Sequence, residues 1–266
     1  MDLLTVKHSY AGGDLIALLP GLQHIYQKTG HKWVIYQQID FELFYYDGMI
    51  PATVNSEGKA VSMNRKHFEM LKPLLLSQEY IEDFREWKGE AVYIDIDKSR
   101  DSRTIPIPYS PLHYWSFFIA PELQCDLSKE WIHLWNTPYD YSDKIIVNRT
   151  ERYQNPYFQY YFLKQYESKL VFSGTEKEKK VFCEKWDLDI PHIQVNDFLE
   201  LARYMHRCKG FIGNQSLCWH IADAMGIDRV LEVCAVFPNT FPTTSNGYAC
   251  VYQEALELYV HKMINK

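Results

Sequence analysis

The feature that most constrains the fold of this chain is a repeated alternation between short apolar runs and longer segments with helical spacing. An apolar run of about five residues has the length of a buried strand, and apolar residues three or four positions apart share one face of a helix. In the first half, this pattern predicts strands over 3–6, 33–37 and 91–96, and helices over 14–29 and 67–87. Strands that alternate with helices predict an α/β fold with a parallel sheet covered by helices.

The same alternation restarts after a region that divides the chain. Residues 101–140 contain five prolines between many aromatic residues, so part of this region should be irregular. Beyond it, strands are predicted over 144–147, 169–172, 192–195, 210–212 and 229–233, and helices over 156–166, 176–186, 197–208, 217–225 and 251–266. We therefore expect two α/β domains, residues 1–138 and 139–250, and a last helix over 251–266 that could pack back on the N-terminal domain.

Composition and charge narrow the class of protein. With 266 residues, of which 47% are hydrophobic, the chain can bury a substantial core. The formal net charge of −6 gives no support for tight, sequence-independent binding to nucleic acid, although it leaves room for a local basic patch. No stretch of about 20 residues is continuously apolar, so no membrane span is expected. The first 22 residues lack a secretory signal pattern and the six scattered cysteines form no C-x-x-C pair, which favours a cytoplasmic location with reduced thiols.

A polar loop between a predicted strand and a predicted helix is the strongest candidate binding element in the second half. The stretch Lys209–Gly226 reads KGFIGNQSLCWHIADAMG, and its loop is Asn214-Gln215-Ser216. The first amides of a helix have no partner within the helix, and the helix dipole is positive there, so these amides can hold a phosphate. The side chains of Gln215 and Ser216 could add donors. The alternative is an ordinary N-cap by Asn214 or Ser216.

Three further loops should open on the same edge of the sheet, where α/β folds bind their ligands. These loops are Asn148–Thr150, Ser173–Glu176 and Asn196–Asp197. Arg149 and Arg152 are natural partners for a diphosphate, because a guanidinium donates two parallel hydrogen bonds to phosphate oxygens. Glu200 could accept hydrogen bonds from ribose hydroxyls, and the alternative is a solvated acid on the helix surface.

From Asn196 to Gly226 the sequence resembles the sugar-nucleotide-binding half of the glycosyltransferase family 9 heptosyltransferases. That family has a helix with the pattern S-L-x-E-L-A, a D-T-G-type loop, and a helix that begins H-L-A-A-A-L-G. Here Asp197–Ala202 is similar to the first pattern, and His220–Gly226 to the last. Val171–Glu176 is similar to the strand of the family that ends in G-G-x-x-E.

The N-terminal half carries the same resemblance. Family members open with an apolar strand, the pattern S-x-L-G-D, and a helix that runs to L-P-A-L; here Ser9, Gly13-Asp14 and Leu19–Leu22 match. Val92–Asp95 resembles the family strand V-I-D-L. The resemblance implies a GT-B fold, in which two Rossmann-like domains with parallel sheets face each other across a cleft. It also implies inverting sugar transfer from a nucleotide sugar without a bound metal.

The sequence departs from the family at three points. The acid-hydroxyl-glycine of the family loop is replaced by Asn214-Gln215-Ser216, and the spacing to His220 is one residue longer. The loop before Asp14 also carries an extra residue. The chain is shorter than typical members, mostly in the acceptor-side half, so the resemblance predicts a nucleotide site but not the acceptor.

Asp14 is the predicted catalytic base, because the family places its proposed base at the corresponding G-D position. A base is needed to remove the proton from the acceptor hydroxyl as it attacks the anomeric carbon, and a carboxylate can do this. The glycines before Asp14 let the backbone pass close to a ligand. The alternative role for Asp14 is the N-cap of a helix that starts at Leu15.

The predicted site therefore has a donor side and an acceptor side, and no metal or cofactor besides the nucleotide-sugar donor. The residues expected to bind the nucleotide sugar are Gly13, Asn148, Arg149, Thr150, Arg152, Gly174, Thr175, Glu176, Glu200, Asn214, Gln215, Ser216 and His220. The residues expected on the acceptor side are Asp95, Lys98 and Arg100. His220 has packing inside the domain as its alternative role. Asp95-Ile96-Asp97 also forms a D-x-D pattern of the kind that binds Mn²⁺ or Mg²⁺ against a diphosphate, and this metal role is the alternative for Asp95.

The leading functional prediction is a glycosyltransferase that uses a nucleotide sugar and a hydroxyl acceptor. One alternative is a binding protein that keeps the nucleotide site but has lost catalysis, which the altered loop at Gln215 favours. Another is a sugar-nucleotide epimerase on the same fold. An oxidoreductase is the weakest alternative, because no G-x-G-x-x-G follows a predicted strand.

Overall fold

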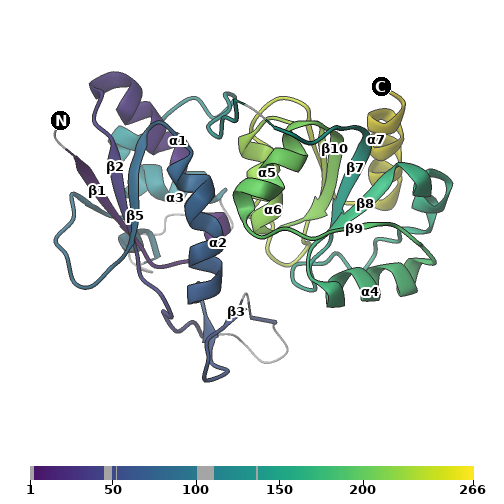
Figure 1. Ribbon diagram of the computed structural model, residues 1–266, viewed down its shortest axis with the longest axis horizontal. Coiled ribbons are helices and arrows are strands. Elements are labelled where there is room, and N and C mark those ends of the chain that lie inside the picture. The colour runs from purple at the N-terminus through teal and green to yellow at the C-terminus, as the bar shows by residue number, and fades with distance from the viewer. Residues whose placement is uncertain (1–2, 45–49, 52, 101–110, 136) are drawn as a thin grey trace. The chain divides into compact units, whose positions relative to one another are not determined.

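The computed structural model describes residues 3–44, 50–51, 53–100, 111–135 and 137–266, and it divides into two compact units. Unit 1 comprises Met1–Leu127, Trp131–His133 and Asp197–Leu199, and unit 2 comprises Ser128–Glu130, Leu134–Asn196 and Glu200–Lys266. Each unit contains its own parallel sheet and its own helices (Figure 1). The domain boundaries drawn from the sequence remain a prediction. Within the described residues, no helix is long and apolar enough to cross a membrane.

Unit 1 is built on a four-stranded parallel sheet with the strand order β5-β2-β1-β6. Its strands are β1 (Leu4–His8), β2 (Trp33–Gln37), β5 (Ile81–Glu86) and β6 (Ile94–Asp95). Its helices are α1 (Gly12–Thr29), α2 (Arg65–Leu76), α3 (Leu112–Ile119) and the 3-10 helices η1 (Ile96–Arg100) and η2 (Pro121–Leu123). A small antiparallel pair, β3 (Thr53–Val54) and β4 (Ala60–Val61), lies between β2 and α2 in the sequence.

Helix α1 connects β1 to β2 and forms the centre of the unit 1 core. Its residues from Leu15 to Leu22 are all buried, which explains why this stretch of the sequence is apolar on every face. The helix ends at Thr29 and is capped by Gly30, whose φ of 74° lies in the left-handed region that favours glycine. The sequence prediction of a helix followed by a strand over 33–37 is confirmed here.

One sequence prediction in unit 1 is wrong, and another is confirmed only in part. The predicted helix over 67–87 is the helix α2 followed by the strand β5, and the predicted strand over 91–96 is reduced to β6. Ile81 and Phe84 stand three positions apart, which imitates helical spacing, but both are buried at the edge of the sheet, where Phe84 pairs with Ile35. Trp33 pairs with Ile81 and the next residue, Val34, pairs with Asp83, so β5 carries one extra residue at Glu82, and this irregularity breaks the two-residue alternation of a strand.

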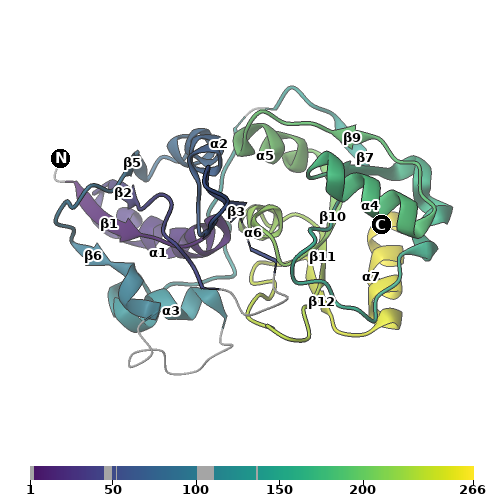
Figure 2. The same ribbon diagram turned by 90° about the horizontal axis from the view of Figure 1, so that it is seen from below.

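Unit 2 is built on a six-stranded parallel sheet with the strand order β12-β11-β10-β7-β8-β9 (Figure 2). Its strands are β7 (Tyr141–Asn148), β8 (Leu170–Ser173), β9 (His192–Ile193), β10 (Cys208–Asn214), β11 (Arg229–Glu232) and β12 (Gly247–Cys250). Its helical elements are η3 (Tyr161–Lys169), α4 (Glu176–Trp186), α5 (Phe198–His206), α6 (Leu217–Ala224) and α7 (Gln253–Asn265). The predicted strands over 144–147, 169–172, 210–212 and 229–233 are confirmed within a few residues.

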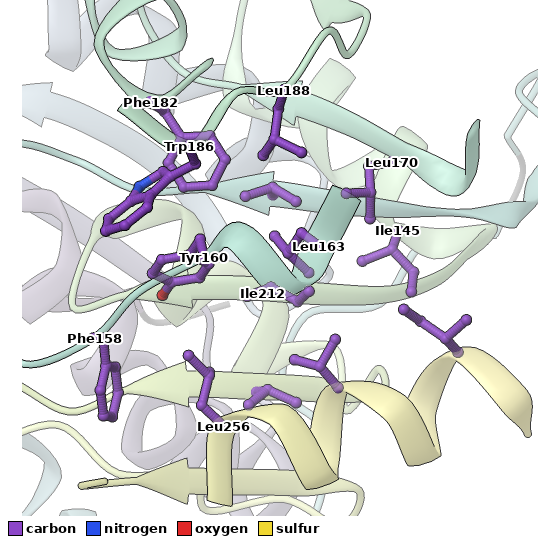
Figure 3. Packing of buried hydrophobic residues seen from close by; sticks show 14 of the residues in the cluster. Ile145, Phe158, Tyr160, Leu163, Leu170, Phe182, Trp186, Leu188, Ile212 and Leu256 are labelled. Atoms are coloured by element: carbon purple, nitrogen blue, oxygen red, sulfur yellow. The ribbon is translucent and has the colours of Figure 1, made fainter. Parts of the chain in front are cut away.

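Two elements of unit 2 differ from the sequence prediction. The segment 156–166 does not form the predicted α-helix, and instead the 3-10 helix η3 begins at Tyr161. The side chains of Phe158, Tyr160 and Leu163 leave this segment to fill one core cluster, so their burial does not follow the period of an α-helix (Figure 3). The strand β12 is not predicted from the sequence, because its Tyr248 and Ala249 are exposed at the sheet edge.

The last helix, α7, packs on the sheet of unit 2. Leu256 is buried in the same cluster as Ile212 (Figure 3). Val260 and Met263 of α7 and Val230 of β11 belong to this cluster as well. The helix α7 therefore belongs to unit 2, and the sequence suggestion that residues 251–266 pack back on the N-terminal domain stays a prediction. The physical reason for the observed packing is that β10 and β11 present an apolar face, which the apolar stripe of α7 covers.

Candidate functional site

Asp14 lies in the first turn of α1, directly after the carboxyl end of β1. The helix begins at Gly12 with Ala11 as its N-cap, so Asp14 is the third helical residue. The alternative role of Asp14, as the N-cap of a helix that starts at Leu15, is therefore wrong. A carboxylate in the first turn is stabilised by the positive end of the helix dipole. Gly13 is half-buried in the same turn.

A pocket in unit 1 brings Asp14 together with residues from β1, η1 and α3. Its lining residues are His8, Tyr10, Asp14, Leu18, Ile96, Ser99, Leu112, Trp115 and Ser116. The walls combine aromatic rings and aliphatic side chains with a carboxylate, an imidazole and hydroxyl groups.

The loop that leads from β1 to Asp14 is held by Ser9. Its backbone N–H and its hydroxyl donate to the two carboxylate oxygens of Asp97, at 2.8 and 2.6 Å. Its carbonyl oxygen accepts from the hydroxyl of Ser62, and its side chain is buried. Because hydrogen bonds to a carboxylate are among the stronger ones, this buried set fixes the start of the loop.

The D-x-D pattern at the end of β6 is engaged in contacts within unit 1. The Lys7 ammonium lies 2.8 Å from Asp97 Oδ2 and 4.0 Å from Asp95 Oδ1, and the N–H of Asp97 donates to Asp95 Oδ1. Among the described residues, no group of three or more His, Cys, Asp or Glu side chains could hold a metal ion. Lys98 lies in η1 next to Asp97, whereas the Arg100 side chain lies outside the described residues. The acceptor-side roles of Asp95, Lys98 and Arg100 stay predictions.

In unit 2, the predicted donor-side loops meet at the carboxyl ends of β7, β8 and β10. Asn148 ends β7 and donates through Nδ2 to the carbonyl oxygen of Ser173, at 2.7 Å. The hydroxyl of Ser216 donates to Asn148 Oδ1 at 2.8 Å. The Ser216 hydroxyl also accepts from the N–H of Trp219, so Ser216 is the N-cap of α6. An N-cap by Ser216 is the alternative role that the sequence analysis gave for this loop. The phosphate role of the loop stays a prediction.

Asn214 and Gln215 face inward and connect their loop to its neighbours. Asn214 is fully buried, accepts from the N–H of Thr150 at 3.0 Å, and donates to the carbonyl oxygens of Thr150 and Arg152. Gln215 accepts from the N–H of Cys234 and donates to the carbonyl oxygen of Phe237. These side-chain amides therefore hold the loops at the edge of the sheet together.

Arg149, a predicted diphosphate partner, pairs with a buried carboxylate of its own unit, and its diphosphate role stays a prediction. Its Nε and Nη2 donate to the two oxygens of Glu232, at 2.6 and 2.9 Å, and both side chains are buried. The Tyr160 hydroxyl and the N–H of Asn155 donate to the same carboxylate. Burial opposes the charge of Arg149, but the hydrogen bonds and the charge of Glu232 raise its pKa above the usual value.

Arg152 stands closer to the surface than Arg149. Its guanidinium lies over the ring of Tyr153 at 4.5 Å from the centroid, and its Nη2 donates to the Tyr153 hydroxyl at 2.8 Å. Tyr153 has a φ of 52°, in the left-handed region that non-glycine residues rarely adopt. A half-buried guanidinium stacked on a ring can still present N–H groups to an anion. The diphosphate role of Arg152 stays a prediction.

The loop after β8 is rigid and well capped. Gly174 has a φ of 151°, Thr175 is the N-cap of α4, and Glu178 completes a capping box with Thr175. Glu176 accepts hydrogen bonds from His192 and Gln194, and the bond from His192 lowers the pKa of its carboxyl group. The sequence does not predict the last two partners, because they lie on β9 and in the segment after it.

We expect Gly174→Ala to destabilise unit 2 by roughly 1–3 kcal/mol, the usual cost of a strained backbone conformation. An alanine Cβ would lie 2.9 Å from Phe172 Cε1 and 3.0 Å from Glu178 Oε2, at a φ that L residues rarely adopt. Urea denaturation of the variant measures the loss. Gly58→Ala is the control, because its φ of 78° is also strained but its Cβ would meet open space. Equal losses in the two variants would contradict the clash.

Glu200 and His220, the remaining donor-side predictions, are both occupied within unit 2. Glu200 accepts from the N–H of Asn196 at 2.7 Å and from the Tyr139 hydroxyl at 3.1 Å. The Asn196 bond lowers the pKa of its carboxyl group. His220 is buried one turn into α6, where packing was its alternative role. Contacts of either residue with a ligand stay predictions.

Solved structures with the same architecture are glycosyltransferases. A glycosyltransferase family 9 protein from Veillonella parvula matches with a TM-score of 0.58 at 12% identity, over 98% of this chain and 92% of that chain. E. coli heptosyltransferase WaaC with ADP matches with a TM-score of 0.60 at 9% identity, over 98% and 100%. E. coli ADP-heptose lipopolysaccharide heptosyltransferase II matches with a TM-score of 0.55 at 12% identity, over 100% and 98%. The chain has the GT-B fold.

The GT-B fold places the two candidate sites at comparable positions in their units. Each lies at the carboxyl ends of parallel strands, where loops and helix N-termini meet: β1 and α1 for Asp14, and β10 and α6 for Ser216. No protein-family model and no curated protein matches this sequence. At 9–12% identity, the likeness establishes the fold, and the activity has to be argued from the residues.

Proposed function

We propose that the protein is a glycosyltransferase that moves a sugar from an ADP-sugar to a hydroxyl acceptor, with inversion and without a metal. The observation that carries the proposal is Asp14, a partly exposed carboxylate at the first strand-to-helix turn of a GT-B fold, in the wall of a pocket. The choice of ADP rests on the neighbour WaaC, which was solved with ADP and with ADP-2-deoxy-2-fluoro heptose.

In the proposed reaction, the acceptor oxygen attacks the anomeric carbon as the bond from that carbon to the diphosphate oxygen breaks. The hydroxyl proton passes to the Asp14 carboxylate, and the leaving diphosphate takes the electron pair of the broken bond. Attack from the side opposite the leaving group inverts the anomeric configuration. The chain's part in this step is to hold a carboxylate within reach of the hydroxyl and donors around the diphosphate.

Two features of unit 2 support a diphosphate site. The first amides of α6 lie at the positive end of the helix dipole, at the carboxyl edge of the sheet. Arg152 lies near this edge, because its backbone carbonyl oxygen accepts a hydrogen bond from the Asn214 side chain. Its guanidinium therefore adds a cation to this part of the unit. With Arg149 paired to Glu232, these groups are the ones we assign to charge stabilisation in the leaving diphosphate.

We expect ADP-heptose and ADP to raise the melting temperature of the purified protein, and to do so equally with and without EDTA. A ligand that binds the folded state stabilises it by about 2.7 kcal/mol at 100 times its Kd. The measurement is a thermal-shift series against ADP-, UDP-, GDP-, CMP- and dTDP-sugars. A shift that EDTA abolishes would contradict the metal-free site, and a shift by another nucleotide alone would contradict the choice of ADP.

A second candidate is a nucleotide-sugar-binding protein without transferase activity. The inward-facing Asn214 and Gln215 and the paired Arg149 favour it, because they leave few side-chain donors for a transition state. Mass spectrometry of the donor after incubation with acceptors separates the two. Sugar transfer or donor hydrolysis by the wild-type protein supports the enzyme, and an intact donor with a positive thermal shift supports the binding protein.

A further inference from the structure

Three side chains form a stack at the carboxyl edge of the unit 2 sheet. The guanidinium of Arg152 lies 4.5 Å from the centroid of the Tyr153 ring, and the ring of Phe237 packs edge-on against Tyr153 with 6.0 Å between the centroids. All three residues are half-buried, and we call them the arginine stack. Arg152 and Tyr153 belong to the loop after β7, whereas Phe237 belongs to the loop after β11, so the stack joins two loops.

Gln215 holds the loop that carries Phe237. Its side chain is 5% exposed, and its Oε1 accepts from the N–H of Cys234 at 3.0 Å. Its Nε2 donates to the carbonyl oxygen of Phe237 at 2.9 Å and to Asn239 Oδ1 at 3.0 Å. A backbone N–H only donates and a carbonyl oxygen only accepts, so these partners fix the orientation of the Gln215 amide. One buried side chain therefore ties the loop after β11 to the loop before α6.

The neighbouring residue, Asn214, holds the other loop of the stack. Its Nδ2 donates to the carbonyl oxygens of Thr150 and Arg152, and its Oδ1 accepts from the N–H of Thr150. The strand order explains why one loop reaches both partners, because β10 lies between β7 and β11. Asn214 and Gln215 thus hold the two halves of the arginine stack from a single loop.

The backbone of Tyr153 also points to a functional role for the stack. Its φ of 52° lies in the left-handed region, where non-glycine residues are rare. Such strained conformations persist only where the surrounding structure enforces them, and they cluster at functional sites. The guanidinium of Arg152 and the ring of Phe237 both contact the Tyr153 ring, so the strain falls at the centre of the stack.

We propose that Gln215 is a positioning residue for the diphosphate and that it acts through the arginine stack. By holding the carbonyl group of Phe237, Gln215 keeps the Phe237 ring against Tyr153. The Tyr153 ring in turn fixes the plane of the guanidinium, which can then donate to phosphate oxygens without first being ordered. Gln215 needs no contact of its own with the ligand. This inference rests on the proposed function, because it requires a diphosphate at this edge of the sheet.

The first test measures ADP binding by calorimetry in the wild type, Gln215→Leu and Arg152→Ala. Leucine keeps most of the buried volume of glutamine but makes none of its three hydrogen bonds. We expect the ADP Kd to rise roughly three- to tenfold in Gln215→Leu. It should rise about ten- to a hundredfold in Arg152→Ala, which removes the charged donor itself. An unchanged Kd in Gln215→Leu would overturn the proposal.

The double variant distinguishes positioning from a general loss of structure. If Gln215 acts through Arg152, then Gln215→Leu raises the ADP Kd no further once Arg152→Ala is in place. A glutamine with a purely structural role would raise the Kd by the same factor in both backgrounds. Additive effects on the binding free energy would therefore contradict the positioning role.

Gln78 provides a matched control in unit 1. It is 3% exposed, its Nε2 donates to the carbonyl oxygen of Leu74 at 3.2 Å, and its Oε1 accepts from the N–H of His133 at 2.9 Å. Gln78→Leu should lower the midpoint of urea denaturation, as Gln215→Leu does, but leave the ADP Kd within about twofold of the wild type. Equal increases of the Kd in the two variants would mean that any lost loop contact weakens binding, against the proposal.

Phe237→Leu tests the middle of the stack and keeps the proposal testable if Gln215→Leu fails to fold. Its ring is half-buried, so the variant should fold, raise the ADP Kd by a factor similar to that of Gln215→Leu, and again add nothing to Arg152→Ala. If the wild type binds ADP but Phe237→Leu binds it equally well, the role of the stack is wrong and the proposed function stands. Absence of ADP binding by the wild type would instead overturn the proposed diphosphate site, and this inference with it.

Discussion

Asp14→Asn should lower kcat by about 10²- to 10⁴-fold, the usual contribution of a positioned general base. Asparagine has nearly the shape of aspartate, so the first turn of α1 and the pocket around it should stay intact. The amide cannot take a proton from the acceptor hydroxyl. The measurement is steady-state transfer from ADP-heptose, with the donor Kd from calorimetry alongside, and we expect that Kd to change by less than about twofold, a free-energy change below roughly 0.5 kcal/mol.

A matched control separates the chemistry at Asp14 from the fold of its loop. Ser9→Ala removes one of the two hydrogen bonds that hold this loop to Asp97, without touching the proposed base. It should lower stability by about 1–3 kcal/mol, because the half-buried Asp97 carboxylate loses a charge-assisted hydrogen bond. Its kcat should fall far less than that of Asp14→Asn. Equal losses of kcat would mean that the loop position, and not the carboxylate, limits the reaction.

The sheets could be predicted from the sequence where strands are buried on both faces. The apolar runs of β7 and β10 stand out because helices cover both sides of their sheet, and the whole run has to be apolar. The edge strands β5 and β12 did not show this signal. On β5 the buried residues Ile81 and Phe84 are three positions apart, as on a helix, and on β12 Tyr248 is exposed. Neither strand therefore reads as a continuous apolar run.

The place of the candidate sites could be predicted because it follows from topology. Parallel strands end at one edge, so the loops at Asn148, Ser173 and Ser216 had to be neighbours, and their hydrogen bonds confirm that they are. The partner of each side chain could not be predicted. Arg149 and Glu232 are 83 positions apart, and no local pattern says that they meet. The same holds for His8 and Gln37, which the register of two strands brings together.

The buried pair of Arg149 and Glu232 gives the largest expected effect on stability. We expect Glu232→Ala to lower the free energy of unfolding of unit 2 by about 3–5 kcal/mol, because it leaves the Arg149 guanidinium buried without its counter-ion. The Tyr160 hydroxyl and the N–H of Asn155 would lose their acceptor as well. Urea denaturation followed by tryptophan fluorescence measures the loss. The exposed pair of Lys180 and Glu184 is the control, and Glu184→Ala should cost less than about 1 kcal/mol.

The double variant decides whether the charge itself causes that loss. Replacing both members, as in Arg149→Met with Glu232→Leu, removes the buried guanidinium together with its partner, so part of the stability should return. If the double variant loses as much free energy of unfolding as the two single variants together, the two charges act independently and the lost packing volume explains the effect. Recovery of stability would mean that the Arg149 guanidinium, which follows the end of β7, is tolerated inside the unit only because the carboxylate of Glu232, the last residue of β11, balances its charge. An arginine held in this way serves the fold, which is why we propose Arg152 and the first amides of α6, and not Arg149, for the diphosphate site.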